Sequence, residues 1–391
     1  MTATGGRGEV HSPGSTASLR PANQRRVVDV LRGRAAEPVT QAELARVTGL
    51  ASGTISNIVR ALTAAGLIET EPGSGRRGTV VRLSRDAGLV VGIDVGHSHL
   101  SVAVADLSAQ LLVEKRRRLA HDHRYEEGLD LAASLLEEAL AEAGHDWDEV
   151  RTVGLGLPAP ISDDVVRSSA ILPGWVGVNA QGVSQERFLR PVHIDNDANL
   201  GALAEHRIGA ARGQDQVVYV KVSSGVGAGL IVDGKIRHGA RGTAGEIGHL
   251  TLDEQGPVCR CGSRGCLEAY ASTGTIAEMM SAQLPGATID DVFESARSGN
   301  VAASRLLEEA GIHLGWGLAT VVNLLNPGVV VVGGDLARAG EPLLESIRLG
   351  LRRHVLADAG DTPVVLSQLG DRASMLGAVL LAAERTDLVV G

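Results

Sequence analysis

One histidine and three cysteines in the second half of the chain have the residue types and spacing of a metal site. His249 precedes Cys259, Cys261 and Cys266, which are the only cysteines among the 391 residues. Three thiolates and one imidazole make a closed tetrahedral ligand set, which is typical of structural zinc. Three ordinary buried cysteines or a reactive thiol are the alternatives, but the clustering favours a metal. We therefore predict a structural Zn²⁺ held by these four side chains.

Carboxylates and amides suited to hydroxyl groups form a second cluster. The run Asp195-Asn196-Asp197-Ala198-Asn199 directly follows apolar Val192 and Ile194. At the end of a strand such side chains can bind sugar hydroxyls, and a carboxylate can take a proton from one of them. The structural alternative is a helix N-cap, because Asp and Asn are favoured there.

Two further acids, Glu246 and Glu268, flank the predicted metal site. Solvated surface acids are the simplest alternative. A rigid metal loop would hold both side chains in fixed positions, however, so we interpret them as additional hydroxyl-binding residues.

Two turns rich in small residues form a weak internal repeat. An apolar run at 89–94 leads into Asp94-Val95-Gly96-His97-Ser98, and a run at 217–222 leads into Ser223-Ser224-Gly225-Val226-Gly227. Such a duplication builds two similar lobes around a cleft, where the backbone N–H groups of facing turns could bind phosphates. A later run at 329–332 ends at Gly333-Gly334, where the backbone could approach a flat ligand closely.

Helical patterns lie between and after these strands. Apolar residues recur on one face at 129–143 and 303–325, and again at 373–385. We expect the last helix to pack back on the first lobe. Because only 2% of the residues are aromatic, the core must consist mostly of Leu, Val, Ala and Ile.

Residues 20–85 have the pattern of a helix-turn-helix. A first helix carries an apolar stripe, a second begins at Thr40, and a third follows Ser52. Thr40 and Glu43 have the spacing of a capping box, in which each side chain bonds the backbone N–H of the other. Gly49 supplies the turn between the second and third helices.

A two-stranded ribbon with a basic tip would complete a winged helix-turn-helix. Arg76 and Arg77 lie at the glycine-flanked tip, which is suited to phosphates or the minor groove. The third helix offers short polar side chains to base edges in the major groove. A helical protein-interaction module is the alternative. The predicted DNA-binding residues are Ser52, Thr54, Ser56, Asn57, Arg60, Arg76 and Arg77.

The charge distribution favours the DNA-binding interpretation. Residues 1–85 hold 12 Arg, no Lys and 6 acidic residues, a net +6; the whole chain is −9, so residues 86–391 carry −15. A basic head on an acidic body suggests that only the head meets an anionic polymer. Codon usage that favours Arg over Lys is the simpler explanation.

The chain has no sequence feature of an exported or membrane protein. No apolar run reaches the roughly 18 residues that span a bilayer, and the N-terminus lacks a signal-peptide pattern. We expect a cytoplasmic protein with no membrane partner.

We expect an α/β chain in four parts. Residues 1–19, rich in Gly, Ser and Thr, are predicted to be a disordered tail, and 20–85 the winged helix-turn-helix. The first lobe would comprise 88–200 with 372–391, and the second lobe, with the zinc site, 201–371.

Taken together, these motifs resemble the ROK family, named for repressors, open reading frames and sugar kinases. The most specific part is Gly245-Glu246-Ile247-Gly248-His249, followed by the three spaced cysteines and Leu267-Glu268. The resemblance extends from about residue 22 to the C-terminus. It implies an actin-like, hexokinase-like fold with two ribonuclease-H-like lobes, usually in a homodimer or homotetramer.

The resemblance also implies roles for individual residues. Asp197 matches the base that takes a proton from the sugar hydroxyl, and His249 would be zinc ligand and sugar contact at once. The implied sugar-binding residues are Asn196, Asp197, Glu246, His249 and Glu268. The implied phosphate and nucleotide positions are Asp94, Gly96, Ser98, Gly225, Gly227, Gly333 and Gly334.

Two departures from the family's kinases argue against efficient use of ATP. Those kinases read Asp-x-Gly-Gly-Thr in the first phosphate loop, but here His97 replaces the second Gly, where a side chain would crowd the γ-phosphate. The second loop reads Ser223-Ser224-Gly225 where Gly-Thr-Gly is expected.

We therefore predict a sugar-responsive DNA-binding regulator, a repressor of carbohydrate uptake or metabolism genes. Its partners would be a double-stranded operator, a sugar or sugar phosphate, and further copies of itself. The alternative is a kinase for hexoses or N-acetylhexosamines that uses ATP and Mg²⁺ and also binds DNA, because Asp197 is present.

Overall fold

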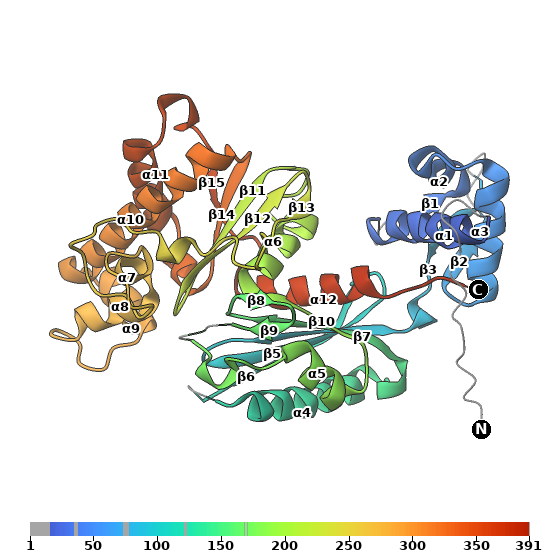
Figure 1. Ribbon diagram of the computed structural model, residues 1–391, viewed down its shortest axis with the longest axis horizontal. Coiled ribbons are helices and arrows are strands. Elements are labelled where there is room, and N and C mark those ends of the chain that lie inside the picture. Colours follow the sequence, from blue (N-terminus) through green and yellow to red (C-terminus); the bar gives the residue numbers. More distant parts are fainter. Residues whose placement is uncertain are drawn as a thin grey trace, which may run out of the picture.

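The computed structural model describes residues 16–34, 38–72, 78–120, 123–167, 169 and 171–390. A small N-terminal head lies at one end of the molecule and two sheet-containing lobes follow (Figure 1). The order of elements is the winged helix-turn-helix and two-lobed α/β architecture expected from the sequence.

The head contains three helices and a small sheet. Thr40 is the N-cap of the second helix, where its side chain accepts a hydrogen bond from Glu43 N at 3.2 Å, and Gly49 ends that helix with φ 71°. The helices are α1 (Thr16–Arg32), α2 (Gln41–Thr48) and α3 (Ser52–Ala64). The strands are β1 (Val39–Thr40), β2 (Ile68–Glu71) and β3 (Val80–Leu83), in the order β1-β3-β2.

Three details of the head differ from the sequence prediction. Helix α1 begins at Thr16, inside the stretch 1–19 predicted to be a tail, and residues 1–15 lie outside the described part. The ribbon gains a third strand, because Val39 and Thr40 pair with β3. The capping box is half formed, since the Glu43 carboxylate forms ion pairs with Arg34 and Arg46.

The two lobes repeat one sheet topology. Numbered along the chain within each lobe, both five-stranded sheets have the spatial order 3-2-1-4-5, so the internal repeat is confirmed. The first sheet consists of β4 (Leu89–Val95), β5 (His99–Asp106), β6 (Leu111–Arg118), β7 (Val150–Leu157) and β10 (Val192–Asn196). The second consists of β11 (Val217–Val222), β12 (Val226–Val232), β13 (Lys235–Ile236), β14 (Val329–Gly333) and β15 (Val364–Leu366).

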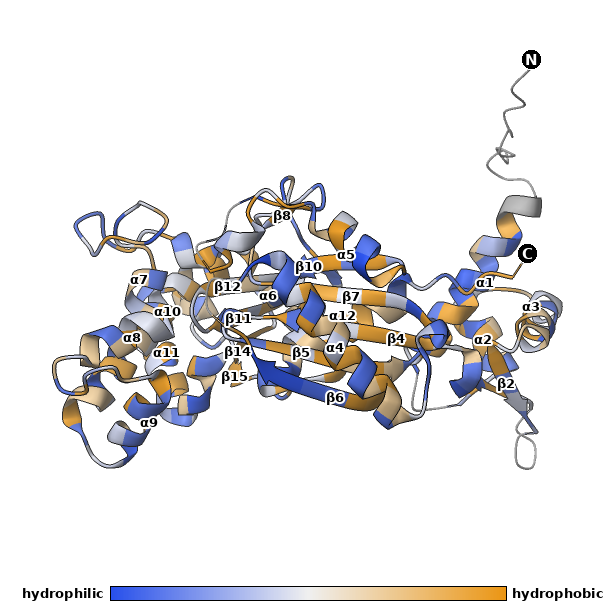
Figure 2. Cartoon of the chain, turned by 90° about the horizontal axis from the view of Figure 1, so that it is seen from below, coloured by the Kyte–Doolittle hydropathy of each residue, from blue (hydrophilic) through white to orange (hydrophobic). Residues whose placement is uncertain are grey.

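Helices cover one face of each sheet. In the first lobe, α4 (Tyr125–Ala143) packs on β5 and β6, with α5 (Ala180–Phe188) beside it (Figure 1). The inner strands of the first sheet are apolar, whereas its edge strand β6 is strongly hydrophilic (Figure 2). A hydrophilic edge discourages pairing with a strand of another molecule. The helices of the second lobe are α7 (Glu268–Ala271), α8 (Thr273–Met280), α9 (Ile289–Arg297), α10 (Val301–Leu325) and α11 (Glu341–His354).

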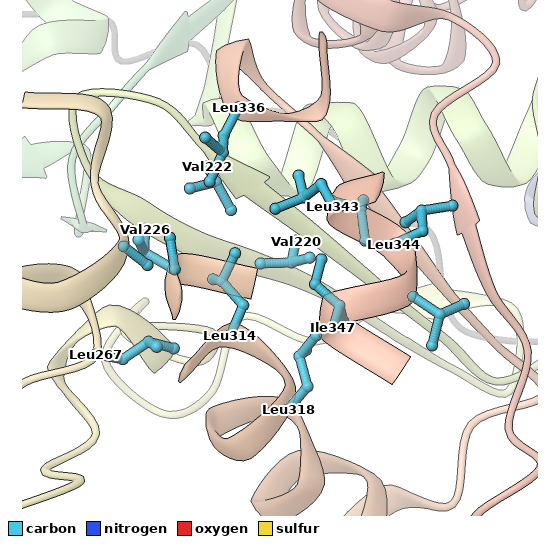
Figure 3. Packing of buried hydrophobic residues seen from close by; sticks show 14 of the residues in the cluster. Val220, Val222, Val226, Leu267, Leu314, Leu318, Leu336, Leu343, Leu344 and Ile347 are labelled. Carbon is cyan, nitrogen blue, oxygen red and sulfur yellow. The ribbon is translucent and has the colours of Figure 1, made fainter. Parts of the chain in front are cut away.

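Aliphatic side chains form the core of the second lobe. Valines of β11 and β12 face leucines of α10 and α11 (Figure 3). Each fully buried side chain of this kind contributes roughly 1.5–3 kcal/mol to folding. The residues seen there include Val220, Val222, Val226, Leu314, Leu318, Leu343 and Ile347.

Two helices lie between the sheets. Helix α12 (Ala373–Arg385) packs on β4 and β7 of the first lobe as predicted, and α6 (Asp197–Ile208) packs on β11 and β12 of the second. The helices contact each other so closely that a Cβ at Gly377 would lie 2.0 Å from Leu200 O. The lobe boundary predicted at 200 therefore falls inside α6, which is one continuous helix.

The C-terminal end of the chain returns to the head. The guanidinium of Arg32 in α1 donates to Thr386 O at 2.6 Å, and Arg25 pairs with Asp387 at 3.0 Å. Val390 N donates to Gln24 Oε1 at 3.2 Å. Figure 1 shows α12 leading from the junction of the lobes toward α1, and a shared hydrophobic cluster also joins the head to strands of the first lobe.

Among the described residues, none of the helices is both long and apolar enough to cross a membrane.

Candidate metal centre and the site between the lobes

The four predicted metal ligands converge in the second lobe. One ligand atom from each of His249, Cys259, Cys261 and Cys266 lies within 4.8 Å of the others. The Sγ atoms of Cys261 and Cys266 are 3.7 Å apart, and His249 Nδ1 is 3.8 Å from Cys259 Sγ. Two thiolates on one tetrahedral Zn²⁺ lie about 3.8 Å apart when Zn–S is about 2.3 Å. This arrangement could hold a metal ion.

Glycines let the chain wrap around this cluster. Gly245 has φ 97°, and a Cβ there would lie 1.9 Å from Ala228 O on β12. Gly265 has φ 63°, and a Cβ there would lie 1.6 Å from Asp253 O. These positions accept only glycine, because side chains would collide with backbone. The backbone thus holds the histidine turn and the cysteine loop together.

The thiols differ in burial and in acidity. Cys259 and Cys266 are buried, while Cys261 and the His249 ring face solvent. Burial raises the pKa of Cys259 and raises that of Cys266 to about 12, whereas the Ser263 backbone N–H lowers the pKa of Cys261. A bound metal ion would displace the protons from these thiols.

Asn196 lies at the junction of β10 and α6, where the chain passes from the first lobe to the second. Its Oδ1 accepts hydrogen bonds from Ala198 N at 2.9 Å and Asn199 N at 3.3 Å, so it is the helix N-cap. Its Nδ2 donates to Ala159 O at 3.3 Å. The structural alternative considered for this run therefore holds for Asn196, which fixes the direction of Asp197.

Glu246 and Glu268 have different surroundings. Glu268 is buried, accepts from Val226 N at 3.0 Å, and forms an ion pair with Arg260 at 2.7 Å. No hydrogen bond or ion pair to the described residues holds the Glu246 carboxyl group. Burial, followed by the charges of Asp197 and Glu268, raises the pKa of Glu246 to about 7. Of these two acids, only Glu268 therefore has a charged partner among the described residues.

Asp197 forms an ion pair with Lys221, a residue that the sequence analysis did not identify. Lys221 Nζ lies 2.7 Å from Asp197 Oδ2 and donates to Ser374 Oγ at 3.0 Å. Ser374, near the start of α12, donates to Asp197 O at 2.9 Å. Lys221 is one of only three lysines in the chain and interrupts an apolar strand, which was the signal available in the sequence.

The first predicted phosphate turn is covered by the chain itself. Asp94 is buried, and His99 Nε2 lies 3.2 Å from its Oδ2. A Cβ at Gly96 would lie 2.3 Å from Cε1 of His99, so the imidazole covers this turn. Ser98 is exposed at its rim.

The second predicted phosphate turn and the pair Gly333-Gly334 pack against residues from other elements. A Cβ at Gly225 would lie 2.8 Å from Ile171 Cδ1 of the first lobe, whereas Gly227 has ordinary space around it. A Cβ at Gly333 would lie 2.3 Å from the Tyr219 hydroxyl. Gly334 has φ 82° and packs against Val222. Local packing therefore accounts for Gly333 and Gly334.

The predicted recognition helix presents a polar surface. Ile55, Ile58, Val59 and Leu62 of α3 are buried, whereas Ser52, Ser56, Asn57 and Arg60 are exposed and Thr54 is half-buried. Arg60 donates to Asn57 Oδ1 at 3.2 Å. The tip arginines Arg76 and Arg77 lie outside the described residues.

Both parts of the chain match known protein families. The ROK family model matches residues 90–385, and a MarR family model matches 21–77. The xylose repressor of Bacillus subtilis is 28% identical over 345 residues, covering 87% of this chain and 90% of the repressor.

Solved structures of ROK family proteins are also similar to this chain. A ROK family transcriptional regulator described as a homologue of Escherichia coli Mlc superimposes with TM-score 0.80 and 25% identity, covering 95% of this chain and 97% of that one. A ROK family glucokinase from Streptomyces griseus, solved with glucose and AMPPNP, has TM-score 0.66 and 30% identity, covering 75% and 99%.

Proposed function

The chain belongs to the ROK family, and on that premise we propose that it is a sugar-responsive transcription regulator. The head would bind operator DNA and the site between the lobes would bind a sugar or sugar phosphate. One observation carries the proposal: α12 begins beside Asp197 through Ser374 and ends on the head through Arg32. Occupation of the site can therefore reach the DNA-binding surface through one rigid helix.

The DNA-binding part rests on α3. Its exposed Ser52, Ser56, Asn57 and Arg60 have the length and hydrogen-bonding groups suited to base edges in the major groove. We include Thr54 beside them, and Arg76 and Arg77 at the wing tip as phosphate or minor-groove contacts. This role places the protein in the cytoplasm, where operator DNA is found.

The sensing part rests on the acids next to the cysteine cluster. We propose that the cluster holds Zn²⁺, which would fix the His249 turn and the Glu268 helix relative to each other. Asn196, Asp197, Glu246, His249 and Glu268 would then contact sugar hydroxyls. Named relatives include a xylose repressor and a glucokinase, so aldoses and their phosphates are the first ligands to test.

Coupling would operate through a symmetric assembly. We propose a homodimer or a homotetramer, in which two heads must lie about 34–36 Å apart to reach successive major grooves. A sugar that prefers one arrangement of the lobes shifts α12 and the separation of the heads. The regulated genes would be those of carbohydrate uptake or metabolism, with the protein acting as a repressor.

The test selects bound DNA first and then measures its affinity. Genomic fragments enriched by the full-length protein supply the operator, whose Kd is measured by fluorescence anisotropy at fixed salt. Xylose, glucose, N-acetylglucosamine and their phosphates are added in turn. We expect at least one to change Kd about tenfold or more, which is about 1.4 kcal/mol. An operator Kd unchanged by every sugar and sugar phosphate contradicts the proposal.

A pair of arginine variants controls the assay. Arg60→Ala should weaken operator binding without changing any sugar-induced rise in melting temperature. Arg46→Ala, an exposed arginine on the neighbouring helix α2, serves as the matched control.

A sugar kinase that also binds DNA is the second candidate. Asp197 at the start of α6 favours it, but its ion pair with Lys221 opposes action as a general base. A coupled assay with ATP, Mg²⁺ and the same sugars separates the two candidates. Turnover that Asp197→Asn abolishes would establish the kinase.

A further inference from the structure

The ammonium group of Lys221 pairs with one buried carboxylate, Asp197, and its charge also acts on a second, Asp94. Lys221 rises from β11 to pair with Asp197 at 2.7 Å, and its charge also acts on Asp94 of β4. Burial alone would lower the pKa of Lys221, but the charges of Asp197 and Asp94 raise it above its ordinary value. The raised pKa favours the charged form of the lysine beside Asp197.

The surroundings of Asp94 lead to the same conclusion. Burial alone would raise the pKa of Asp94, but the charge of Lys221 and the hydrogen bond with His99 hold it below its usual range. Asp94 Oδ1 is shielded from solvent and has no hydrogen-bond partner among the described residues. The contact with His99 therefore involves the other oxygen, Oδ2, alone.

Side chains also occupy the turns on either side of this cation. The His99 ring lies directly over Gly96, and Ile171 lies against Gly225 while its carbonyl oxygen is 3.1 Å from His97 Nδ1. A phosphate bound by the backbone of these turns would have to displace the ring and the isoleucine. One side chain, His99 or Ile171, thus lies against each of the two turns.

We propose that Lys221, assisted by His99, is a built-in counter-cation that replaces a metal–nucleotide complex at this end of the site. Carboxylates are typical ligands of hard divalent cations, but here Lys221 pairs with Asp197 and His99 contacts Asp94. The domain then binds its sugar without ATP and Mg²⁺. The sugar part of this inference rests on the proposed function, whereas the counter-cation part does not.

Nucleotide binding to the wild-type, zinc-loaded chain is the first test. Mg²⁺·ATP is titrated by calorimetry with and without each sugar, and melting temperatures are recorded in parallel. We expect no Mg²⁺·ATP binding up to millimolar concentrations and a sugar-induced shift that Mg²⁺·ATP leaves unchanged. Micromolar binding of Mg²⁺·ATP, or phosphorylation of a sugar, overturns the proposal.

Removal of the ammonium group is the second test. Lys221→Met leaves Asp94 and Asp197 without it, so Mn²⁺, counted by electron paramagnetic resonance, should gain a site. We expect this site to bind at least about tenfold more tightly than any in the wild-type chain, because an opposite charge within about 4–6 Å changes such equilibria by 1–3 pK units. The double variant Lys221→Met/Asp94→Asn should lose it again.

A matched lysine and the nucleotide titration keep the test decisive. Lys235→Met, which changes an exposed lysine on β13, should bind Mn²⁺ as the wild-type chain does. A folded Lys221→Met variant that gains no Mn²⁺ site contradicts the counter-cation role. If Lys221→Met does not fold, the wild-type nucleotide titration still decides. If both tests succeed but no sugar changes the melting temperature, the proposed function fails while the counter-cation role stands.

Discussion

Two acids of the two-lobed domain, Glu246 and Asp94, have opposite electrostatic surroundings. Glu246, at the cysteine end, has no cationic partner among the described residues, and burial raises its pKa to about 7. Asp94, at the end with the predicted phosphate turns, has Lys221 and His99 nearby, and its pKa lies below the usual range. An acid without a partner is available to a ligand, whereas a compensated acid is not. We therefore call the surroundings of Glu246 the open end of the proposed site and those of Asp94 the closed end.

The largest expected effect is that of disrupting the cysteine cluster beside Glu246. Cys266→Ser replaces a fully buried ligand, so we expect loss of bound zinc and more than about 4 kcal/mol of unfolding free energy. Elemental analysis and denaturant unfolding measure both quantities. Ser263→Ala, in the same loop, is the control and should change neither. Undiminished zinc content in Cys266→Ser would contradict the ligand assignment.

Glu246→Ala tests the open end directly. Loss of a hydrogen bond to a charged group costs about 1.5–3 kcal/mol, so affinity for the active sugar should fall roughly 10–100-fold. Calorimetry measures it, and Glu254→Ala, an exposed acid nearby, is the matched control. If Glu246→Ala binds sugar as tightly as the wild-type chain, the ligand does not use this acid.

How much of this contrast the sequence could predict depends on the interaction. The clustering of His249 with the three cysteines, the cap at Thr40 and the strand ends were predictable, because short spacings and local hydrogen bonds determine them. The pairing of Lys221 with Asp197 joins residues 24 positions apart, and Ser374 lies 153 positions from Lys221. Only the packing of α6 against α12 brings these groups together, so no spacing rule could reveal them.

The head shows the same limit. Burial of Val27, Val28 and Leu31 followed from helical periodicity. The start of α1 at Thr16 did not, because Gly, Ser and Thr are typical of loops. The hydrogen bond from Arg32 to the C-terminal segment also depends on tertiary structure, since its partner Thr386 is 354 residues away.

Arg32→Ala would test whether the open end communicates with the head. The Arg32 side chain is only 11% exposed and donates to Glu384 O and Thr386 O, so its loss should loosen α1 from the end of α12. We expect the sugar-induced change in operator Kd to shrink by severalfold while the sugar-induced melting shift persists. Arg26→Ala, exposed on the same helix, is the control. A sugar response of Kd that is undiminished in Arg32→Ala would exclude this route.

The smallest predicted effect concerns Asp195, which pairs with His238. A hydrogen bond from His238 to Asp195 at 2.8 Å raises the pKa of that histidine above its ordinary value of 6.5. This stabilisation is therefore present below pH 6.5 and is lost as pH rises through the folded-state pKa. His238→Gln should remove the dependence, with an effect below about 1 kcal/mol because the half-exposed pair is screened by solvent. Denaturant unfolding between pH 5.5 and pH 8 measures it, and equal pH slopes in both proteins would contradict the prediction.

The central claim is that a sugar held beside Glu246 controls the affinity of the head for DNA. The most direct measurement is the operator Kd of the full-length wild-type chain and of Glu246→Ala, each with and without a sugar concentration that saturates the wild type. The account predicts a change of about tenfold or more in the wild-type chain and little change in Glu246→Ala at that sugar concentration. Equal operator Kd values with and without sugar in the wild-type chain, or the same sugar response in both proteins, would contradict it.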